Sequence, residues 1–435
     1  MLSVVISIVV LVVVLILGVP VPFTFLLASF ILIIMGGYDY SFLLPYGFSK
    51  GTSIILCAIP LFILAGGIIE RGKIGDAIVN WVSCLVGNVK GALGVILVIG
   101  CGFFGSISGS GAATISCIGS IMLPRMYEAG YPKGHCTALI ASAGVLGLLI
   151  PPSLNTILYA WVAGASILAC FLATVIPGII LIVLFSIINI VLLRNNQSIK
   201  MEDPRTFKET LALVPKRTFS ATPAIIAPII ILGGIYSGFM TPTEAAGVAC
   251  LYAIPVGALI YKGLTLKSFF DAVASSACTT GVVLIMLVSV QILSRLYIME
   301  QVPMRILELL NTVSDNPVVC LLIINGLIVL IGMIMDDGSS ILLATPLLLP
   351  VVSAFGISPV QFAAILGVNV GMANVTPPCA PFLYLACRIG KTKVNEVLKP
   401  TFILILFAWL PVLILTTYIP QFATWLPNLA LGTGY

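Results

Sequence analysis

Long apolar runs separated by short polar breaks make up most of the chain. Runs of about 17 to 25 residues recur from end to end, and each is long enough to cross roughly 30 Å of hydrocarbon as a helix. Alternation of polar and apolar residues at strand period is absent, which argues against a β-barrel. The pattern predicts an all-α polytopic membrane protein. Crossing helices are expected at about 2–18, 22–38, 52–70, 136–164, 167–193, 218–239, 243–262, 275–298, 359–388 and 398–419.

Two further apolar stretches, near 90–124 and 317–352, are each interrupted midway by polar or glycine residues. Each could form two crossings, or one re-entrant hairpin whose tip stops inside the membrane. With hairpins, 17 of the 20 Lys and Arg residues fall on the same side as the polar linker 194–217. The positive-inside rule makes that side cytoplasmic. We therefore expect two hairpins, a cytoplasmic linker, and both chain ends on the opposite side.

The two halves of the chain repeat each other at a shift of 226 positions. Leu123-Pro124 then falls on Leu349-Pro350, Gly130 on Gly356, and Pro151-Pro152 on Pro377-Pro378. Each half has five crossings, an odd number, so the halves must insert in opposite senses. This predicts an inverted repeat, which is typical of secondary transporters. The first repeat is 1–193 (in-plane arm 72–88, hairpin 90–124, broken helix 136–164), the linker is 194–217, and the second repeat is 218–435 (arm 300–314, hairpin 317–352, broken helix 359–388).

Composition excludes several other classes of protein. Only 8% of the residues are charged and 60% are hydrophobic, whereas soluble domains carry about a quarter charged residues. The eleven cysteines stand singly with no CxxC pair, which argues against a disulfide frame or a metal knuckle. No Gly-rich phosphate loop ending in Lys-Ser/Thr is present, which disfavours ATP-driven transport. An intramembrane enzyme would need aspartates on facing helices or a His–Glu metal motif. Asp336 and Asp337 are adjacent in sequence and His135 is the sole histidine, so the chain offers neither arrangement. We therefore expect that the protein is not an enzyme.

The candidate site combines the two proline pairs with the two polar hairpin tips. A proline pair breaks a helix and frees backbone carbonyls, which are tolerated at membrane depth only if something satisfies them. A hard cation such as sodium takes carbonyl and hydroxyl oxygens. Sodium ligands are therefore predicted in the first half at Ser106, Ser108, Gly109, Ser110, Thr114, Pro151 and Asn155, and in the second half at Asp336, Gly338, Ser339, Asn369, Thr376 and Pro377.

Asp336 and Asp337 are the two acids placed deep in the membrane, where acids are costly and usually functional. We favour Asp336 as an ion or proton ligand and leave open that the other aspartate only caps a helix. His135 is expected to be solvated at a helix start. No intramembrane Lys or Arg supplies a positive charge, so an anionic substrate would rest on helix N-terminal amides, hydroxyls and sodium. Candidate substrate-binding residues are Ser108, Ser110, Ser153, Ser340 and Pro378.

Several motifs resemble the large membrane subunit of tripartite ATP-independent periplasmic (TRAP) transporters over nearly the whole chain. They are Gly-Ser-Ile-Ser-Gly-Ser from Gly105, Leu149-Ile150-Pro151-Pro152-Ser153, Pro177-Gly178, Thr241-Pro242-Thr243-Glu244-Ala245-Ala246 and Thr376-Pro377-Pro378. The resemblance implies sodium-coupled uptake of a small organic anion by an elevator mechanism in the bacterial inner membrane, with both termini periplasmic. It also implies a small four-helix membrane subunit, expected on a separate chain, and a periplasmic substrate-binding protein. Two or more sodium ions and no organic cofactor are expected.

Two positions bear on the substrate within this resemblance. Thr114 matches the threonine common in C4-dicarboxylate-type members, where sialic-acid-type members often have aspartate. After Thr376-Pro377-Pro378 the family usually has glycine near position 380, whereas this chain has Ala380. A stand-alone sodium–anion symporter of similar architecture is the alternative function, and transport by this chain alone would favour it.

Overall fold

The computed structural model describes residues 2–86, 90–199, 207–432 and 434, without the side chains of 207–214 and 216. Every secondary-structure element among them is helical. Eight of these described helices are long and apolar enough to cross a bilayer, and a bent pair of helices makes a ninth candidate. The all-α, multi-span architecture predicted from the sequence is confirmed.

In the first half, the described residues form eleven α-helices and two short 3₁₀ turns, η1 (Tyr40–Phe42) and η2 (Ile54–Cys57). The α-helices are α1 (Leu2–Ile16), α2 (Val21–Gly36), α3 (Leu43–Gly51), α4 (Ala58–Arg71), α5 (Ile74–Leu85), α6 (Ala92–Ser108), α7 (Gly111–Glu128), α8 (Lys133–Gly144), α9 (Leu146–Leu149), α10 (Leu154–Ala163) and α11 (Ile167–Leu193).

The second half forms another eleven α-helices, with π-helical turns η3 (Val256–Ile260) and η4 (Ile405–Trp409). The α-helices are α12 (Phe207–Tyr236), α13 (Pro242–Pro255), α14 (Leu266–Met299), α15 (Val302–Val313), α16 (Pro317–Ile334), α17 (Asp337–Ala354), α18 (Pro359–Ala373), α19 (Pro381–Gly390), α20 (Val394–Leu404), α21 (Leu410–Tyr418) and α22 (Gln421–Leu431).

Short polar side chains fix many of the helix starts. Ser110, Ser153 and Ser358 each accept the backbone N–H three residues ahead at the start of α7, α10 and α18. Thr241 and Glu244 form a reciprocal capping box at the start of α13. Such caps satisfy helix N–H groups that have no intrahelical partner. The starts of these helices are therefore set by hydrogen bonds from nearby side chains.

The shift of 226 positions relates helix boundaries as well as residues. Helix α7 spans 111–128 and α17 spans 337–354, which are the same positions after the shift. Helices α6 and α16 end at 108 and 334, and α8 and α18 begin at 133 and 359. Each half thus contains the same elements in the same order: a pair of helices joined by a short turn, a broken helix and a last long helical segment.

The two broken helices touch at equivalent positions. A Cβ atom placed on Gly371 of α18 would lie only 2.6 Å from Cγ1 of Val145, which precedes α9. Position 145 shifted by 226 is position 371. The helices therefore cross where the repeat maps onto itself, and the missing side chain at 371 allows that close approach.

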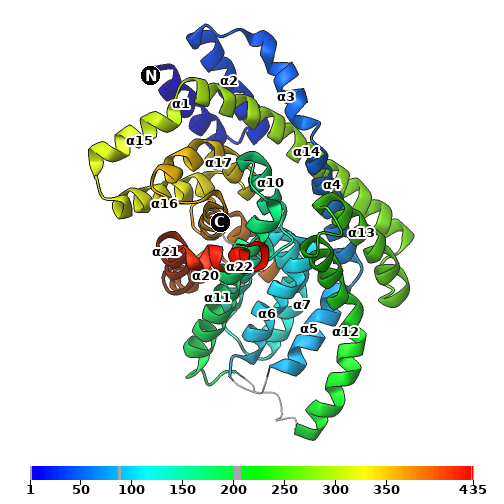
Figure 1. Cartoon of the computed structure of the whole chain (residues 1–435). Helices are drawn as coiled ribbons and strands as arrows, with labels where there is room; N and C mark the ends of the chain where they lie inside the picture. The colour runs from blue at the N-terminus through cyan, green and yellow to red at the C-terminus, as the bar shows by residue number, and fades with distance from the viewer. Residues whose placement is uncertain (1, 87–89, 200–206, 433, 435) are drawn as a thin grey trace.

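Two large hydrophobic clusters and one small cluster fill the interior of the described part of the chain. One large cluster joins α2, α4 and α14 to parts of α10 and α17 and contains Phe25, Phe62 and Tyr297. The other joins the helix pairs to the broken helices and contains Phe104 and Phe362. Figure 1 shows the pair α6–α7 beside α5 at the lower end of the view, and the pair α16–α17 beside α15 at the upper left.

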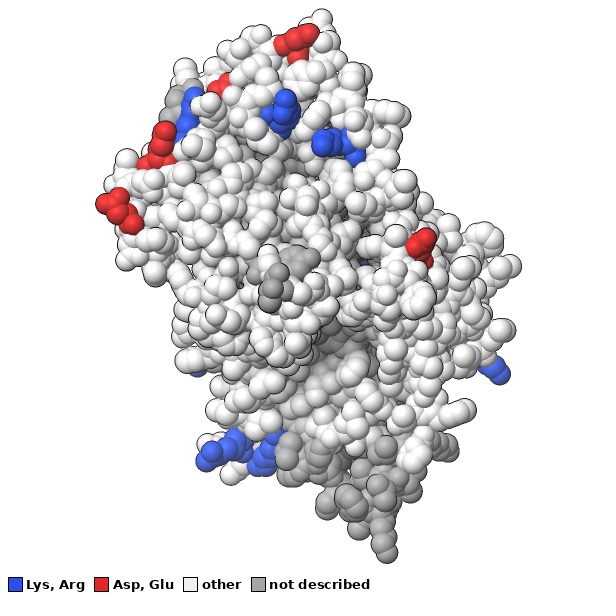
Figure 2. Space-filling model, viewed as in Figure 1, with Lys and Arg blue, Asp and Glu red and all other residues white. Residues whose placement is uncertain are grey.

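Most charged side chains on one face of the molecule lie away from its middle. On the face shown in Figure 2, Lys, Arg, Asp and Glu gather toward the upper and lower ends, and a broad band between them carries almost none. Large apolar side chains such as Ile179, Val183 and Ile187 on α11 are about half exposed. An uncharged, apolar outer band is the surface expected of a protein that faces the hydrocarbon of a bilayer.

Four elements differ from the sequence prediction. Helix α12 begins at Phe207, inside the segment 194–217 that was expected to be a linker. Residues 43–51 form helix α3, which the interrupted apolar pattern did not indicate. The crossing expected from 275 begins at Leu266, because Thr265 and Ser268 cap the helix there reciprocally. A final helix, α22, follows the last expected crossing and packs against α11.

Candidate functional site

The first hairpin turns within two residues between α6 and α7. Gly109 ends α6 with a φ of +61°, a backbone conformation that glycine adopts without strain. Ser110 then caps α7 by accepting the N–H of Ala113. The Thr114 hydroxyl, one turn into α7, donates to the carbonyl of Ser110 at 2.8 Å.

Three oxygens gather at this tip, and one of them, the Ser108 hydroxyl, makes only weak bonds to the other two. The Ser108 hydroxyl lies 3.4 Å from both the Ser110 carbonyl oxygen and the Thr114 hydroxyl, at the far limit of hydrogen bonding. Ser108 and Thr114 are buried. A buried set of neutral oxygens, one of them loosely bonded, fits the ligand preference of a hard monovalent cation.

The first tip packs directly against the break in α8–α10. Cβ atoms placed on Gly109 and Gly147 would lie 2.8 Å from the Pro152 carbonyl oxygen and 2.7 Å from the Thr114 hydroxyl. A Cβ atom placed on Gly105 of α6 would lie 2.6 Å from the Cα of Gly147. The sequence-predicted residues Ser108, Gly109, Ser110, Thr114 and Pro151 are thereby brought into one region, together with Gly147, which the sequence analysis missed.

The first break itself runs from Ile150 to Ser153. Its Pro151–Pro152 peptide bond is cis, as is that of Pro377–Pro378. The Ser153 hydroxyl donates to the Leu148 carbonyl at 2.5 Å and accepts from the backbone of Thr156, so it closes one helix and starts the next. The helix axis bends by 45° across the break.

The second hairpin repeats the chemistry of the first. Asp336 caps α17 through the N–H of Ser339, as Ser110 caps α7 at the equivalent position. The Ser340 hydroxyl donates to the Asp336 carbonyl at 2.8 Å, as Thr114 does to Ser110. The Ser339 hydroxyl bonds the Asp336 carboxylate and also reaches the Met286 sulfur on α14 at 2.8 Å.

The two aspartates have different surroundings. The Asp336 side chain is exposed on the surface of this chain and caps α17, and its role as an ion or proton ligand stays a prediction. Asp337 is half-buried, and its carboxylate accepts a 2.7 Å hydrogen bond from the Asn155 side-chain amide of α10. This bond joins the half-helix after the first break to the tip of the second hairpin.

The second break runs from Asn374 to Ala380. Thr376 donates its hydroxyl to the Met372 carbonyl of its own helix, and the N–H of Phe382 returns to the Asn374 carbonyl. Ala380 has a φ of +27°, in the left-handed region that favours glycine. The Asn374 side chain is fully buried, and neither of its amide atoms has a hydrogen-bond partner among the described residues.

Some candidate residues serve their own helices or another network. Ser106 donates to the Phe103 carbonyl one turn back. Asn369 donates to the Asn325 side chain on α16 at 2.9 Å, and Asn325 donates to the Thr417 hydroxyl on α21 at 3.0 Å. These bonds join α16 of the second hairpin to α18 and α21. The isolated Asn325 gave no periodic signal in the sequence.

His135 corrects another sequence expectation. It is buried rather than solvated, and its Nε2 lies 3.0 Å from Asn189 Oδ1 on α11. The Asn189 amide also donates to the Gly91 carbonyl at 2.8 Å. A partner 54 residues away is a tertiary contact that local sequence could not reveal.

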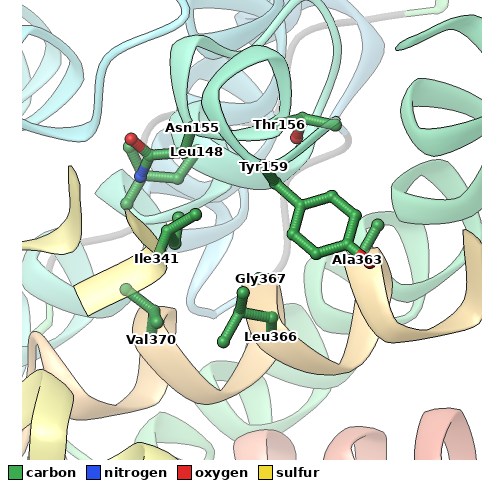
Figure 3. A pocket seen from close by; sticks show the side chains of 9 residues that line it. All are labelled: Leu148, Asn155, Thr156, Tyr159, Ile341, Ala363, Leu366, Gly367 and Val370. Carbon is green, nitrogen blue, oxygen red and sulfur yellow. The ribbon is translucent and has the colours of Figure 1, made fainter. Parts of the chain in front are cut away.

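A small cavity lies between the two halves of the molecule. It is lined by Leu148 and by residues of α10, α17 and α18: Asn155, Thr156, Tyr159, Ile341, Ala363, Leu366, Gly367 and Val370. In Figure 3 the Tyr159 ring points from α10 toward Ala363 of α18. The Tyr159 hydroxyl donates to the Pro359 carbonyl at 2.5 Å, so this ring also ties α10 to the start of α18. The cavity is mostly apolar, with Asn155 at one edge beside Asp337.

Comparison with known proteins gives a consistent picture. Residues 8–422 match the family model described as "Tripartite ATP-independent periplasmic transporter, DctM component". The chain is 31% identical to the sialic acid TRAP transporter large permease protein SiaM of Vibrio cholerae, covering 96% of each chain. It is 32% identical to the C4-dicarboxylate large permease protein DctM of Rhodobacter capsulatus, covering 86% of this chain and 87% of that one.

A third relative is longer than this chain. The isethionate TRAP transporter permease protein DctMQ of Oleidesulfovibrio alaskensis is 33% identical over 93% of this chain, which spans 63% of its length.

Solved structures share the fold at low sequence identity. The YdaH transporter of Alcanivorax borkumensis superposes with a TM-score of 0.65 at 14% identity, covering 88% of each chain. The MtrF structure from Neisseria gonorrhoeae gives 0.62 at 13% identity, covering 87% of this chain and 84% of that one.

Proposed function

Because the chain belongs to the DctM-component family of tripartite ATP-independent periplasmic transporters, we propose that it performs sodium-coupled uptake of a small organic anion. A periplasmic binding protein hands over the anion, and an elevator movement carries it across the bilayer. The family is one of transporters and not of enzymes, and its members are multi-pass proteins of the bacterial inner membrane. The prediction of a TRAP large permease subunit is confirmed by the family match and by the identity of about 30% to the large permeases.

The observation that carries sodium coupling is the oxygen cluster at the first hairpin tip. Ser108, Ser110 and Thr114 present two hydroxyls and a carbonyl within 3.4 Å of one another, against the Pro151–Pro152 break. Sodium bound there would supply positive charge beside the substrate in a region without Lys or Arg. The second tip, with Asp336, Gly338, Ser339 and the Thr376–Pro377 break, is proposed as the related site of the other repeat.

We propose that helices α2, α4 and α14 form the static scaffold and that the hairpins and broken helices move against them. Helix α4 of the proposed scaffold packs closely against the first hairpin, because a Cβ placed on Gly66 would lie 2.9 Å from the Ser108 carbonyl oxygen. The first repeat is proposed as 1–193 and the second as 218–435, inserted in opposite senses, with linker 194–217 cytoplasmic and both termini periplasmic.

The substrate is proposed to be a carboxylate or related acid. Relatives are named for sialic acid, C4-dicarboxylates and isethionate. Helix N-termini at Ser110, Ser153 and Asp336 offer backbone amides to an acid group. A TRAP system comprises a binding protein and a small membrane subunit, and we propose that the small subunit here is a separate chain. Co-purification with a co-expressed small subunit tests that assignment.

The test of the function is reconstitution of the chain in liposomes with its small subunit and a panel of candidate binding proteins. Uptake of labelled organic acids should require an inward sodium gradient and should fail when either partner is omitted. Uptake by the chain alone would instead identify a stand-alone symporter.

A matched pair of variants tests the oxygen cluster. Ser108→Leu should abolish sodium-dependent uptake, because the bulky side chain displaces the tip oxygens. Ser120→Leu, at a serine of the same hairpin that is exposed and bonds its own helix, should leave uptake intact. Unchanged uptake in Ser108→Leu would remove the first tip from the site.

A further inference from the structure

Five exposed basic side chains gather where the second broken helix ends and helix α20 begins. Arg388 lies in the last turn of α19, Lys391 and Lys393 lie in the short connection to α20, Lys399 lies on α20, and Lys133 begins α8. All five are exposed. This set is called the basic surface below, and it lies on the side of the molecule that the positive-inside rule assigns to the cytoplasm.

Contacts between helix ends hold the basic surface together. The Tyr127 hydroxyl on α7 donates to the Gly390 carbonyl at the end of α19, at 3.1 Å. The Lys133 ammonium lies 5.5 Å from the centre of the Tyr127 ring. A Cβ atom placed on Gly134 would collide with the Glu396 carbonyl oxygen, so the first turns of α8 and α20 touch. Residues from both repeats therefore contribute to one surface.

The chain supplies little negative charge to the basic surface. None of the five side chains forms an ion pair or a hydrogen bond with the described residues. Helices α8, α19 and α20, with the connection between the last two, contain one acid, Glu396. Helix α7 ends with Glu128, which Arg125 on the same helix offsets. Five basic groups against one acid leave four positive charges without a matching acid, and such charges repel one another.

The outer face of α20 leads from the basic surface onto an apolar stripe. Lys399, Phe402 and Leu406 follow one another at intervals of three and four residues, which places them on one helix face. Phe402 and Leu406 are each 54% exposed. They belong to the candidate membrane span Val394–Tyr418, so they face hydrocarbon. A lysine one turn before such a stripe reaches the level of the lipid headgroups.

The positive-inside rule alone does not explain this arrangement. It accounts for basic residues on one side of the membrane, and it does not require them to adjoin one lipid-facing stripe. Lys262 and Lys267 lie on the same expected side, between α13 and the first turn of α14, and both are exposed. Asp271 follows Lys267 by four residues, at a spacing that favours an ion pair along a helix.

We propose that the basic surface binds the headgroups of anionic phospholipids, whose acyl chains lie along Phe402 and Leu406. Lys and Arg side chains donate to the phosphate oxygens, and the excess of positive charge favours a lipid with a net negative charge. The inference rests on the position of α20 in the membrane. It depends neither on the coupling ion nor on the transported substrate.

The test is thermal stabilisation of the purified chain with its small subunit in detergent micelles. The probes are dioctanoyl phosphatidylglycerol, dioctanoyl phosphatidylcholine and glycerol 3-phosphate. Phosphatidylglycerol should raise the melting temperature at a lower mole fraction than phosphatidylcholine does, because only the former has a net negative charge. Glycerol 3-phosphate has no acyl chain to lie along the stripe and should give no stabilisation.

Two matched double variants assign the lipid preference to the basic surface. A Lys beside an anionic membrane surface changes the affinity about fivefold, so losing two should change it about 25-fold. Lys393→Gln with Lys399→Gln should therefore raise the half-stabilising fraction of phosphatidylglycerol about 25-fold. Lys262→Gln with Lys267→Gln removes the same charge elsewhere on that side and should keep the wild-type value. Each shift is measured from the variant's own lipid-free melting temperature.

Four results would overturn the inference. Equal stabilisation by the two lipids would show that headgroup charge is not recognised. An unchanged response in the Lys393 and Lys399 variant would move the lipid away from the basic surface, and an equal loss in both double variants would indicate a response to overall charge. Stabilisation by glycerol 3-phosphate as strong as that by phosphatidylglycerol would identify a site for soluble phosphates instead.

Discussion

Gly147 offers a direct way to perturb the first tip without touching a polar atom. A methyl group at this position would lie 2.7 Å from the Thr114 hydroxyl and 2.8 Å from the Ser110 carbonyl oxygen. Ordinary contact begins near 3.4 Å, so Gly147→Ala must push the tip away by about 0.6 Å. The neighbour at Ser110 is backbone and cannot rotate out of the way.

Two opposing terms decide the effect on stability. Overpacking of a well-packed interior costs about 1–3 kcal/mol, and replacing glycine by alanine in a helix returns up to about 1 kcal/mol. We expect a net loss of about 1 kcal/mol in the free energy of unfolding. We also expect a larger effect on sodium: a displaced oxygen cluster should raise the half-saturating sodium concentration about tenfold, which corresponds to about 1.4 kcal/mol.

The assay is uptake into proteoliposomes at graded sodium, paired with thermal denaturation in detergent. Gly326→Ala is the matched control, because it makes the same helix substitution in the second hairpin where an added Cβ meets nothing within 4 Å. That variant should keep wild-type sodium dependence. A Gly147→Ala protein with unchanged sodium dependence and stability would refute both the close packing and its role in the site.

Three further changes have defined outcomes. Ala380→Gly should raise the free energy of unfolding by about 1 kcal/mol, because glycine relieves the φ of +27°, and a lower melting temperature would contradict this. Asn325→Leu should lower the free energy of unfolding, measured by denaturation, by about 1–3 kcal/mol, because it removes the hydrogen-bond partner of Asn369 and Thr417. Asp336→Asn retains a good helix cap, so a weaker sodium dependence of uptake would report ion binding, and wild-type dependence would leave Asp336 with capping alone.

Much of the fold was predictable from the sequence because a helix that crosses the bilayer needs a long run of apolar residues. Apolar runs of sufficient length gave most of the helices, and the shift of 226 positions anticipated the match between α7 and α17. Helix α3 was missed because its apolar residues are interrupted by Pro45, Gly47 and Lys50. The start of α14 was missed because Lys267 and Asp271 made the extension past the crossing look like a loop.

The candidate site was predictable in its elements but not in its contacts. Proline pairs and serine-rich tips marked the breaks and turns because proline and glycine restrict the backbone locally. Which aspartate reaches across to Asn155 depends on the rotation of α17 relative to α10, and no local pattern encodes that rotation. The same reason hid the burial of His135 and the solitary position of the Asn374 amide.

The contact of Val145 with Gly371 has a mechanical consequence. A point shared by equivalent positions behaves as a pivot: when one broken helix tilts against the other, this point stays nearly still. Both proline pairs follow their pivot residue by six to seven positions, so the same tilt sweeps each through a similar arc. The first polar tip packs on the Pro151–Pro152 break, so this tip is carried along the arc of its own broken helix.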